Sequence, residues 1–357
     1  MKLDLQTELC RRLNITYPVI QAGMAGGPTT AEMVAGVSNA GGLGKLGAAY
    51  MVPDAIRDTV RAIRRLTDRP FGVNLFTVDM TDDLSRVREV QRMLDPLREE
   101  LGIAHGKEDL RTPNWFAEQF QVLLEEEVPV ISTAFGVLPD DAMREAKAAG
   151  RTVMTMVTTV EEAKLAEEKG ADVLVAQGSD AGGHRGTFDI TKHPYGANIG
   201  TFSLVPQIVD NVRVPVVAAG GVMDGRGLVA ALALGAQGVQ LGTRFLTSAE
   251  SGAHPAYKKA LLESTEEDTV ITKAFSGRPA RGIRNAFIDH VENSGVAPLP
   301  FPSQNTATGD IRKEAAAQND PRYLSLWAGQ ATRLLTDGDR AEEIVKEIIA
   351  QAQELLK

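Results

Sequence analysis

The chain has 357 residues, of which 43% are apolar and 24% are charged, with a formal net charge of −9 at pH 7. This composition is typical of a globular protein long enough for one α/β barrel or two medium domains, and the acidic balance argues against a nucleic-acid-binding surface. Its one cysteine excludes an internal disulfide, and no apolar run reaches the ~20 residues that span a bilayer, so we expect a cytoplasmic protein without a secretory signal.

Short apolar runs recur along the chain. After an N-terminal helix expected from Leu5 to Leu13, eight runs rich in Val, Ile and Ala follow one another. Most lack strict alternation, as expected of strands that are buried on both faces of a parallel sheet. The predicted strands are 19–23, 43–48, 71–76, 128–135, 152–157, 171–177, 214–220 and 238–245.

Helix-compatible segments separate the predicted strands. One of them starts with Thr159-Val-Glu-Glu, a capping pattern, and ends before Gly170, a common C-terminal signal. Strands and helices in regular alternation predict an α/β fold, a (β/α)8 TIM barrel, with a doubly wound sheet of fewer strands as the main alternative. The predicted helices are 29–39, 53–66, 139–149, 159–169, 202–210, 224–234 and 255–263.

Two regions of the chain do not fit the regular alternation of strands and helices. Residues 77–126 contain two charged helical segments, and the tail contains a proline-rich loop and a final amphipathic helix from about Asp339 to Leu356. We therefore expect a barrel over 1–290, with a helical insertion at about 77–126, and a C-terminal extension over 291–357. Long insertions on a barrel usually cover its active face, and we expect the loop and helix of the extension to do so here.

Polar side chains and glycines gather at the predicted carboxyl ends of the strands, where barrels carry their function. Asn74, Gln177 and Gln240 are neutral amides that can both donate and accept hydrogen bonds. The seventh and eighth strands end in Gly220-Gly221 and Gly242, where barrels commonly hold a phosphate on backbone N–H groups. Together these residues suit flavin mononucleotide (FMN), although each glycine alone is also typical of a helix-starting turn and each amide of a structural one.

The sixth strand leads into the loop Gly178-Ser-Asp-Ala-Gly-Gly-His-Arg-Gly186. His184 in this loop is the type of side chain best suited to move a proton near neutral pH, and the glycines around it favour a loop that presents it to a ligand. A tight turn with a surface histidine is the alternative. The five histidines and one cysteine show no ligand-like spacing, so we expect no metal site.

The same residues fall in six longer motifs: Gln-Ala-Gly-Met-Ala-Gly-Gly (21–27), Asn-Ala-Gly-Gly-Leu-Gly (39–44), Gly-Val-Asn-Leu-Phe (72–76), Gly-Ser-Asp-Ala-Gly-Gly-His-Arg-Gly (178–186), Ala-Ala-Gly-Gly-Val (218–222) and Gly-Val-Gln-Leu-Gly-Thr-Arg-Phe (238–245). In this order they resemble the nitronate monooxygenase family, formerly called 2-nitropropane dioxygenases. The tail Leu326-Trp-Ala-Gly-Gln330 is more similar to that branch than to the FMN-dependent enoyl-acyl-carrier-protein reductases, which share most of the barrel motifs.

The resemblance implies that His184 is the catalytic histidine. It also implies oxidation of alkyl nitronates, and of nitroalkanes if His184 removes their α-proton, by O2 to carbonyl compounds and nitrite. No nucleic-acid or membrane partner is expected, and a homodimer is left open. The FMN contacts that the resemblance implies are Ala22, Gly23, Met24, Asn74, Gln177, Gly182, Gly183, Gly220, Gly221, Gln240, Gly242 and Thr243.

Two other functions stay open. One is hydride transfer from NAD(P)H through FMN to an enoyl thioester or a quinone, and the other is a non-catalytic flavin- or phosphate-binding protein in which His184 is structural. The aromatic residues of the substrate pocket are also open. Trp115, Tyr257, Phe301 and Tyr323 are candidates among which the sequence does not choose.

Overall fold

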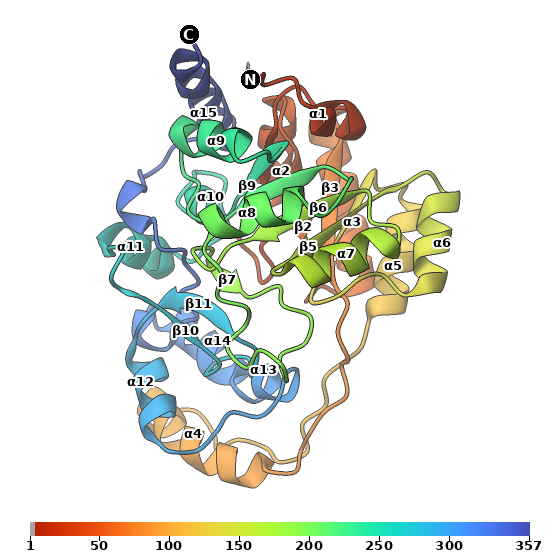
Figure 1. The fold of residues 1–357 in the computed structure, drawn as a ribbon. Helices are drawn as coiled ribbons and strands as arrows, with labels where there is room; N and C mark the ends of the chain where they lie inside the picture. The colour runs from red at the N-terminus through yellow and green to blue at the C-terminus, as the bar shows by residue number, and fades with distance from the viewer. Residues whose placement is uncertain (1–3) are drawn as a thin grey trace.

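Eight parallel strands form the centre of the computed structural model, which describes residues 4–357 (Figure 1). They are hydrogen-bonded in the order β1-β9-β8-β6-β5-β4-β3-β2, and a bridge between Ile20 and Leu43 joins β1 to β2, so the sheet closes into a barrel. All eight predicted strands are confirmed. Their bounds are β1 (Val19–Gln21), β2 (Gly44–Gly47), β3 (Phe71–Phe76), β4 (Val130–Ala134), β5 (Thr152–Val157), β6 (Val173–Gln177), β8 (Val216–Ala219) and β9 (Gly238–Leu241).

The strands are buried on both faces, which explains their lack of alternation. Side chains such as Val73 pack outward against the surrounding helices, whereas Met154 and Val217 belong to a separate cluster. This second cluster also contains Leu9 and Leu13 of α1 (Glu8–Leu13), so the N-terminal helix packs against strand residues of the barrel. The chain before it, residues 1–3, lies outside the described residues.

The outer helices are α2 (Ala31–Asn39), α3 (Pro53–Leu66), α5 (Phe116–Glu125), α6 (Asp140–Ala148), α7 (Val160–Glu168), α8 (Thr201–Val209), α9 (Gly225–Ala233) and α15 (Ala341–Leu355). The last of these packs between α9 and α2 and buries Ile344 and Ile348 in the core that they share. The final helix of the chain is therefore the eighth outer helix of the barrel. Of the two helices in the expected insertion, α5 also belongs to the outer layer, since it packs on α3 and β3.

A further hydrophobic cluster, outside the barrel, lies at one end of it, below it in Figure 1. It is built from residues 87–101 and 246–328, which we call the cap. The division of the chain at residue 290 stays a prediction, whereas this cluster joins segments from both sides of it. The helices of the cap are α4 (Val87–Leu101), α11 (Pro255–Glu263), α12 (Ala286–Asn293), α13 (Ser303–Ala307), α14 (Gly309–Ala317) and η1 (Pro321–Tyr323). Two short helices flank it, α10 (Thr243–Leu246) and η2 (Thr332–Leu334).

A small antiparallel sheet joins the cap to the barrel and was not expected from the sequence. It has the order β10 (Thr269–Thr272), β11 (Ala280–Ile283), β7 (Gly183–His184). His184 pairs with Ala280 and Gly183 with Arg281, so the loop after β6 is held as an edge strand of the cap (Figure 1). None of the helices in residues 4–357 has both the length and the apolar character that crossing a membrane requires.

Candidate active site

A cavity of about 450 Å³ lies at the carboxyl ends of the barrel strands, and residues of the cap form its outer wall. Every site residue expected from the sequence lines this cavity. They are Ala22, Gly23, Met24, Asn74, Gln177, Gly182, Gly183, His184, Gly220, Gly221, Gln240, Gly242 and Thr243. Residues that lie far apart along the chain therefore meet at one cavity, and the local geometry distinguishes their roles.

His184 is held by a serine from the cap. Its Nε2 lies 2.8 Å from Ser276 Oγ, and that hydroxyl is placed to donate to the Arg278 carbonyl oxygen at 3.1 Å. Ser276 Oγ then accepts the hydrogen bond from His184, so the ring proton lies on Nε2 and the lone pair on Nδ1. His184 lines the cavity, and within residues 4–357 its Nδ1 makes no hydrogen bond.

The surroundings of His184 keep its ring neutral. Its pKa is lowered from 6.5 to about 3, mainly by burial and in addition by the positive charges of Arg278 and Arg312. The Arg278 guanidinium lies 4.1 Å from the centre of the Phe135 ring, and Arg312 lines the outer part of the cavity, where it donates to Asn305. The site therefore combines a neutral base with two nearby cations, an arrangement that favours an anionic ligand.

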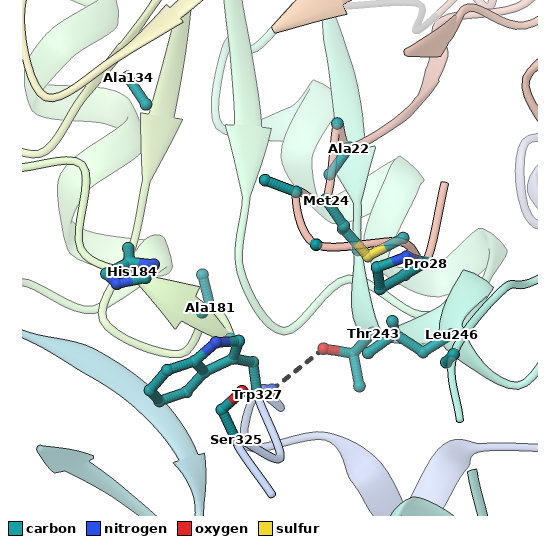
Figure 2. A pocket seen from close by; sticks show the side chains of 18 of the residues that line it. Ala22, Met24, Pro28, Ala134, Ala181, His184, Thr243, Leu246, Ser325 and Trp327 are labelled. Carbon is teal, nitrogen blue, oxygen red and sulfur yellow. Dashed lines mark hydrogen bonds between the residues drawn. The ribbon is translucent and has the colours of Figure 1, made fainter. Parts of the chain in front are cut away.

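Aromatic rings surround the histidine. The centre of its ring lies 5.4 Å from that of Trp327, 5.7 Å from that of Phe135 and 6.5 Å from that of Phe301. Figure 2 shows the Trp327 indole between His184 on one side of the cavity and Met24 and Thr243 on the other. This side of the cavity is apolar, apart from the histidine.

The four aromatic candidates from the sequence differ in position. Tyr257 lines the cavity and donates its hydroxyl proton to the Trp327 carbonyl, and Phe301 packs near His184. Trp115 is 39% exposed at the start of α5, and Tyr323 is buried in the cap; neither of these two lines the cavity.

Gln177 holds the histidine loop. Its Nε2 donates to the His184 carbonyl at 2.9 Å, and its Oε1 accepts from the Gly186 N–H at 2.8 Å. The buried guanidinium of Arg185 adds donors to the Gln177 and Gly178 carbonyls at 2.9 and 2.7 Å. These contacts explain why an amide comes directly before the loop: it fixes the position of His184 over the barrel mouth.

The other two amides keep their donors for a ligand. Asn74 Oδ1 accepts from Ser132 Oγ at 2.8 Å, and Gln240 Oε1 accepts from Lys45 Nζ at 2.5 Å. With both oxygens occupied from within the barrel, the Nδ2 and Nε2 groups are the parts available to the cavity. This side of the cavity therefore offers hydrogen-bond donors.

Backbone N–H groups are free at the other end of the cavity. Those of Gly221, Gly242 and Thr243 donate to no backbone acceptor within residues 4–357. Gly221 has a φ of 72°, a conformation that glycine adopts without strain and that follows the end of β8. Three unpaired N–H groups at neighbouring strand ends form a suitable site for a phosphate or another anion.

A segment of the cap side covers this anion site. The Gly329 N–H donates to Thr243 Oγ1 at 3.0 Å, the dashed line in Figure 2. A Cβ atom at Gly182 would lie 2.5 Å from the backbone of Ala328 and Gly329, so only glycine allows this approach. Near the first strand, a Cβ atom at Gly23 would lie 2.8 Å from Asn74 Cβ, and Ala22 and Met24 complete this wall.

Sequence reasoning missed several residues that shape the site: Lys45, Ser132, Ser276, Arg278 and Arg312. Lys45 carried a signal, since it is a lysine within the apolar segment 43–48. Ser276 and the two arginines lie in the tail and gave no signal, because they reach the site only through the folding of the cap. Within residues 4–357, no group of three or more His, Cys, Asp or Glu side chains is placed to hold a metal ion.

Comparisons with known proteins agree with this architecture. The family model described as nitronate monooxygenase matches residues 7–351. Proteins named probable nitronate monooxygenase from Staphylococcus haemolyticus and Staphylococcus aureus (strain Newman) are 44% and 42% identical, over 98% and 99% of both chains. The structure of a nitroalkane oxidase from Streptomyces ansochromogenes is similar with a TM-score of 0.90 and 37% identity, covering 97% of this chain and 98% of that chain. FabK from Thermotoga maritima gives a TM-score of 0.78 and 31% identity, covering 99% of this chain and 98% of that chain.

Proposed function

The chain belongs to the nitronate monooxygenase family of oxidoreductases, and from this premise we propose that it uses FMN and O2 to oxidise alkyl nitronates to carbonyl compounds and nitrite. The observation that carries the proposal is the combination at one cavity of a neutral histidine, the Arg312 guanidinium, two amide donors and three free N–H groups.

The cavity fits FMN in size and in chemistry. Its volume of about 450 Å³ lies within the range of roughly 300–1,000 Å³ that is usual for small-molecule and cofactor sites. The free N–H groups of Gly221, Gly242 and Thr243 would hold the phosphate, and the amide donors of Asn74 and Gln240 would meet acceptor atoms of the ring. When bound, FMN would supply the electron-accepting chemistry that no amino-acid side chain provides.

His184 orients the substrate in this proposal. His184 lines the cavity, and Ser276 holds its Nε2–H, so Nδ1 is the atom left to accept a proton from the substrate. A pKa of about 3 makes the ring a weak base before a ligand binds. Removal of the α-proton from a neutral nitroalkane requires His184 to act as a base, which its low pKa disfavours. A nitronate is already ionised and requires no such step.

The charges around His184 also favour the ionised substrate. Arg278 and Arg312 bring positive potential to the cavity, and the aromatic rings of Phe135 and Trp327 limit access of water to it. An anion gains more from fixed charges in such surroundings than it would in water. Alkyl nitronates carry this charge, and the neutral nitroalkanes do not.

The likeness to FabK favours a second candidate, NAD(P)H-dependent reduction of an enoyl thioester or a quinone. Anaerobic titration with propionate 3-nitronate and, separately, with NADH distinguishes the two. We expect the nitronate to bleach the flavin within the mixing time and NADH to do so slowly. Rapid bleaching by NADH without a response to the nitronate would favour the second candidate, and purified protein without FMN would contradict both.

A further inference from the structure

Lys45 is a fully buried lysine inside the barrel. It lies on β2, and its Nζ contacts Gln240 Oε1 on β9 at 2.5 Å and Ser132 Oγ on β4 at 3.3 Å. These strands lie on opposite sides of β2 in the closed sheet, so the side chain crosses the barrel interior. Gly72, its neighbour on β3, makes room for it, because a Cβ atom there would lie 3.0 Å from Lys45 Cγ.

No carboxylate pairs with this lysine among residues 4–357. Its partners are an amide oxygen, a hydroxyl oxygen and, at 3.6 Å, the sulfur of Met154. Burial of an ammonium group without a counter-ion costs stability, and this burial lowers the Lys45 pKa from 10.5 to about 7. A methionine or leucine would fill the same space without that cost, so the lysine calls for an explanation other than packing.

The lysine controls the orientation of two site amides. It donates directly to the oxygen of Gln240, and it donates to Ser132, whose hydroxyl proton then goes to the oxygen of Asn74. An ammonium group has three donors and no acceptor, so neither amide can turn its NH₂ group toward it. Both NH₂ groups are thereby directed to the cavity.

We propose that Lys45 is a positioning and charge-supplying residue of the flavin site. It turns the amide donors of Asn74 and Gln240 toward the acceptor edge of the ring, and it places a cation beneath that edge. This inference rests on the proposed FMN site. Because the ring gains electron density on reduction, a cation next to it stabilises the reduced form more than the oxidised form.

The test is the redox equilibrium of the bound flavin, which does not depend on turnover. FMN-loaded wild type and Lys45→Gln are reduced anaerobically at about pH 6, below the Lys45 pKa of about 7, so that the lysine is charged. A reference dye is present, and the ratio of oxidised to reduced flavin is read from absorbance. Glutamine retains a donor and removes the charge. We expect the equilibrium constant for reduction to fall about tenfold, or about 30 mV for a two-electron couple.

Two further variants separate charge from positioning. Ser132→Ala breaks the relay to Asn74 and keeps the cation, so we expect weaker FMN binding and a redox equilibrium within twofold of wild type. Lys164→Met removes an exposed lysine on α7 and should change neither quantity. Lys45→Met, which also loses the hydrogen bonds, should lower both FMN affinity and the equilibrium constant.

The proposal is overturned if Lys45→Gln keeps a redox equilibrium within twofold of wild type, or if Lys45→Met binds oxidised FMN with wild-type affinity. Folding is checked by circular dichroism before each titration. A wild-type protein that binds no flavin would instead overturn the proposed function, and this is established before any variant is compared.

Discussion

His184 is the residue on which the proposed chemistry depends most directly. Replacement by asparagine keeps a polar group of similar size and removes the ring base, so His184→Asn should retain its flavin spectrum. We expect kcat/KM to fall by roughly 10²–10⁴, the range for loss of a general base, with the larger loss for neutral nitroalkanes. His105→Asn, at a 62% exposed side chain in the turn after α4, is the matched control. Near-normal kinetics of His184→Asn with both substrate types would contradict the assignment.

Ser276 acts through the histidine, so its effect is expected to be smaller and of a different kind. Ser276→Ala removes the acceptor of Nε2–H, and loss of one hydrogen bond of about 1 kcal/mol corresponds to about fivefold in kcat/KM. The specific readout is the ¹⁵N chemical shift of the His184 ring, which reports the tautomer. We expect mixed tautomers in Ser276→Ala and restoration in Ser276→Thr. An unchanged tautomer in the alanine variant would show that the serine does not set it.

Which site residues the sequence could predict depends on how local their contacts are. Gln177, Gly182 and His184 belong to one short segment, and its several glycines predict a loop. Ser276 and Lys45 are different, since Ser276 lies 92 residues from His184 and Lys45 lies 195 residues from Gln240 along the chain. Nothing in the local sequence gives the partner of such a residue, because the closure of the barrel and the docking of the cap decide it.

At the scale of elements, the turn after β8 is where the anion site can be tested. Gly221→Val places a side chain where N–H groups face the cavity, so we expect lower FMN occupancy in a protein that is still folded by circular dichroism. Gly295 has the same φ of 72° and lies after α12, away from the cavity. Gly295→Val therefore reproduces the backbone strain without blocking the site.

The paired variants isolate the role of position. If both lose stability to a similar extent and only Gly221→Val loses FMN, the turn after β8 is a binding element. Full FMN occupancy in Gly221→Val would place the phosphate elsewhere, and equal loss of FMN in both variants would attribute the effect to the strain of a non-glycine residue at positive φ.

The elements that the sequence predicted well are those with strong local patterns. Most of the eight strands are short apolar runs that contain Val or Ile, and helices separate them along the chain. The β7–β11–β10 sheet escaped prediction because β7 has only two residues, and its strand character comes entirely from pairing with β11. The place of α15 in the outer layer was also not predicted, since its contacts with α9 and α2 join segments that are far apart along the chain.

At the scale of the whole molecule, two buried titratable groups couple the site to the stability of the fold. His184 has its pKa lowered to about 3 in the folded chain, against 6.5 when unfolded. Between these values the unfolded chain binds the extra proton, so His184 contributes stability that rises with pH from about 3 to 6.5. Lys45 has its pKa lowered from 10.5 to about 7, so its contribution rises with pH in a separate window above 7.

We therefore expect the free energy of unfolding of the flavin-free protein to rise between pH 7 and 9.5, measured by urea denaturation. In that range the unfolded chain carries a protonated lysine and the folded chain a neutral one, which gives at most about 1.4 kcal/mol per pH unit. The range stops below the pH at which tyrosines titrate. Burial raises the pKa of Tyr50, for example, to about 12.

Lys45→Gln has no titratable group at this position and should show a smaller rise, whereas Lys164→Met, which removes an exposed lysine, should keep the wild-type rise. The rise that remains in Lys45→Gln comes from other lysines whose pKa burial lowers, Lys258 and Lys273. The difference in unfolding free energy between wild type and Lys45→Gln is the decisive quantity, because contributions from all other groups cancel in it. That difference should shift in favour of the wild type as the pH increases from 7, since deprotonation removes the cost of a buried ammonium group. A difference that stays constant from pH 7 to 9.5 would mean that Lys45 keeps its proton throughout and that the barrel interior solvates it far better than its neutral partners suggest.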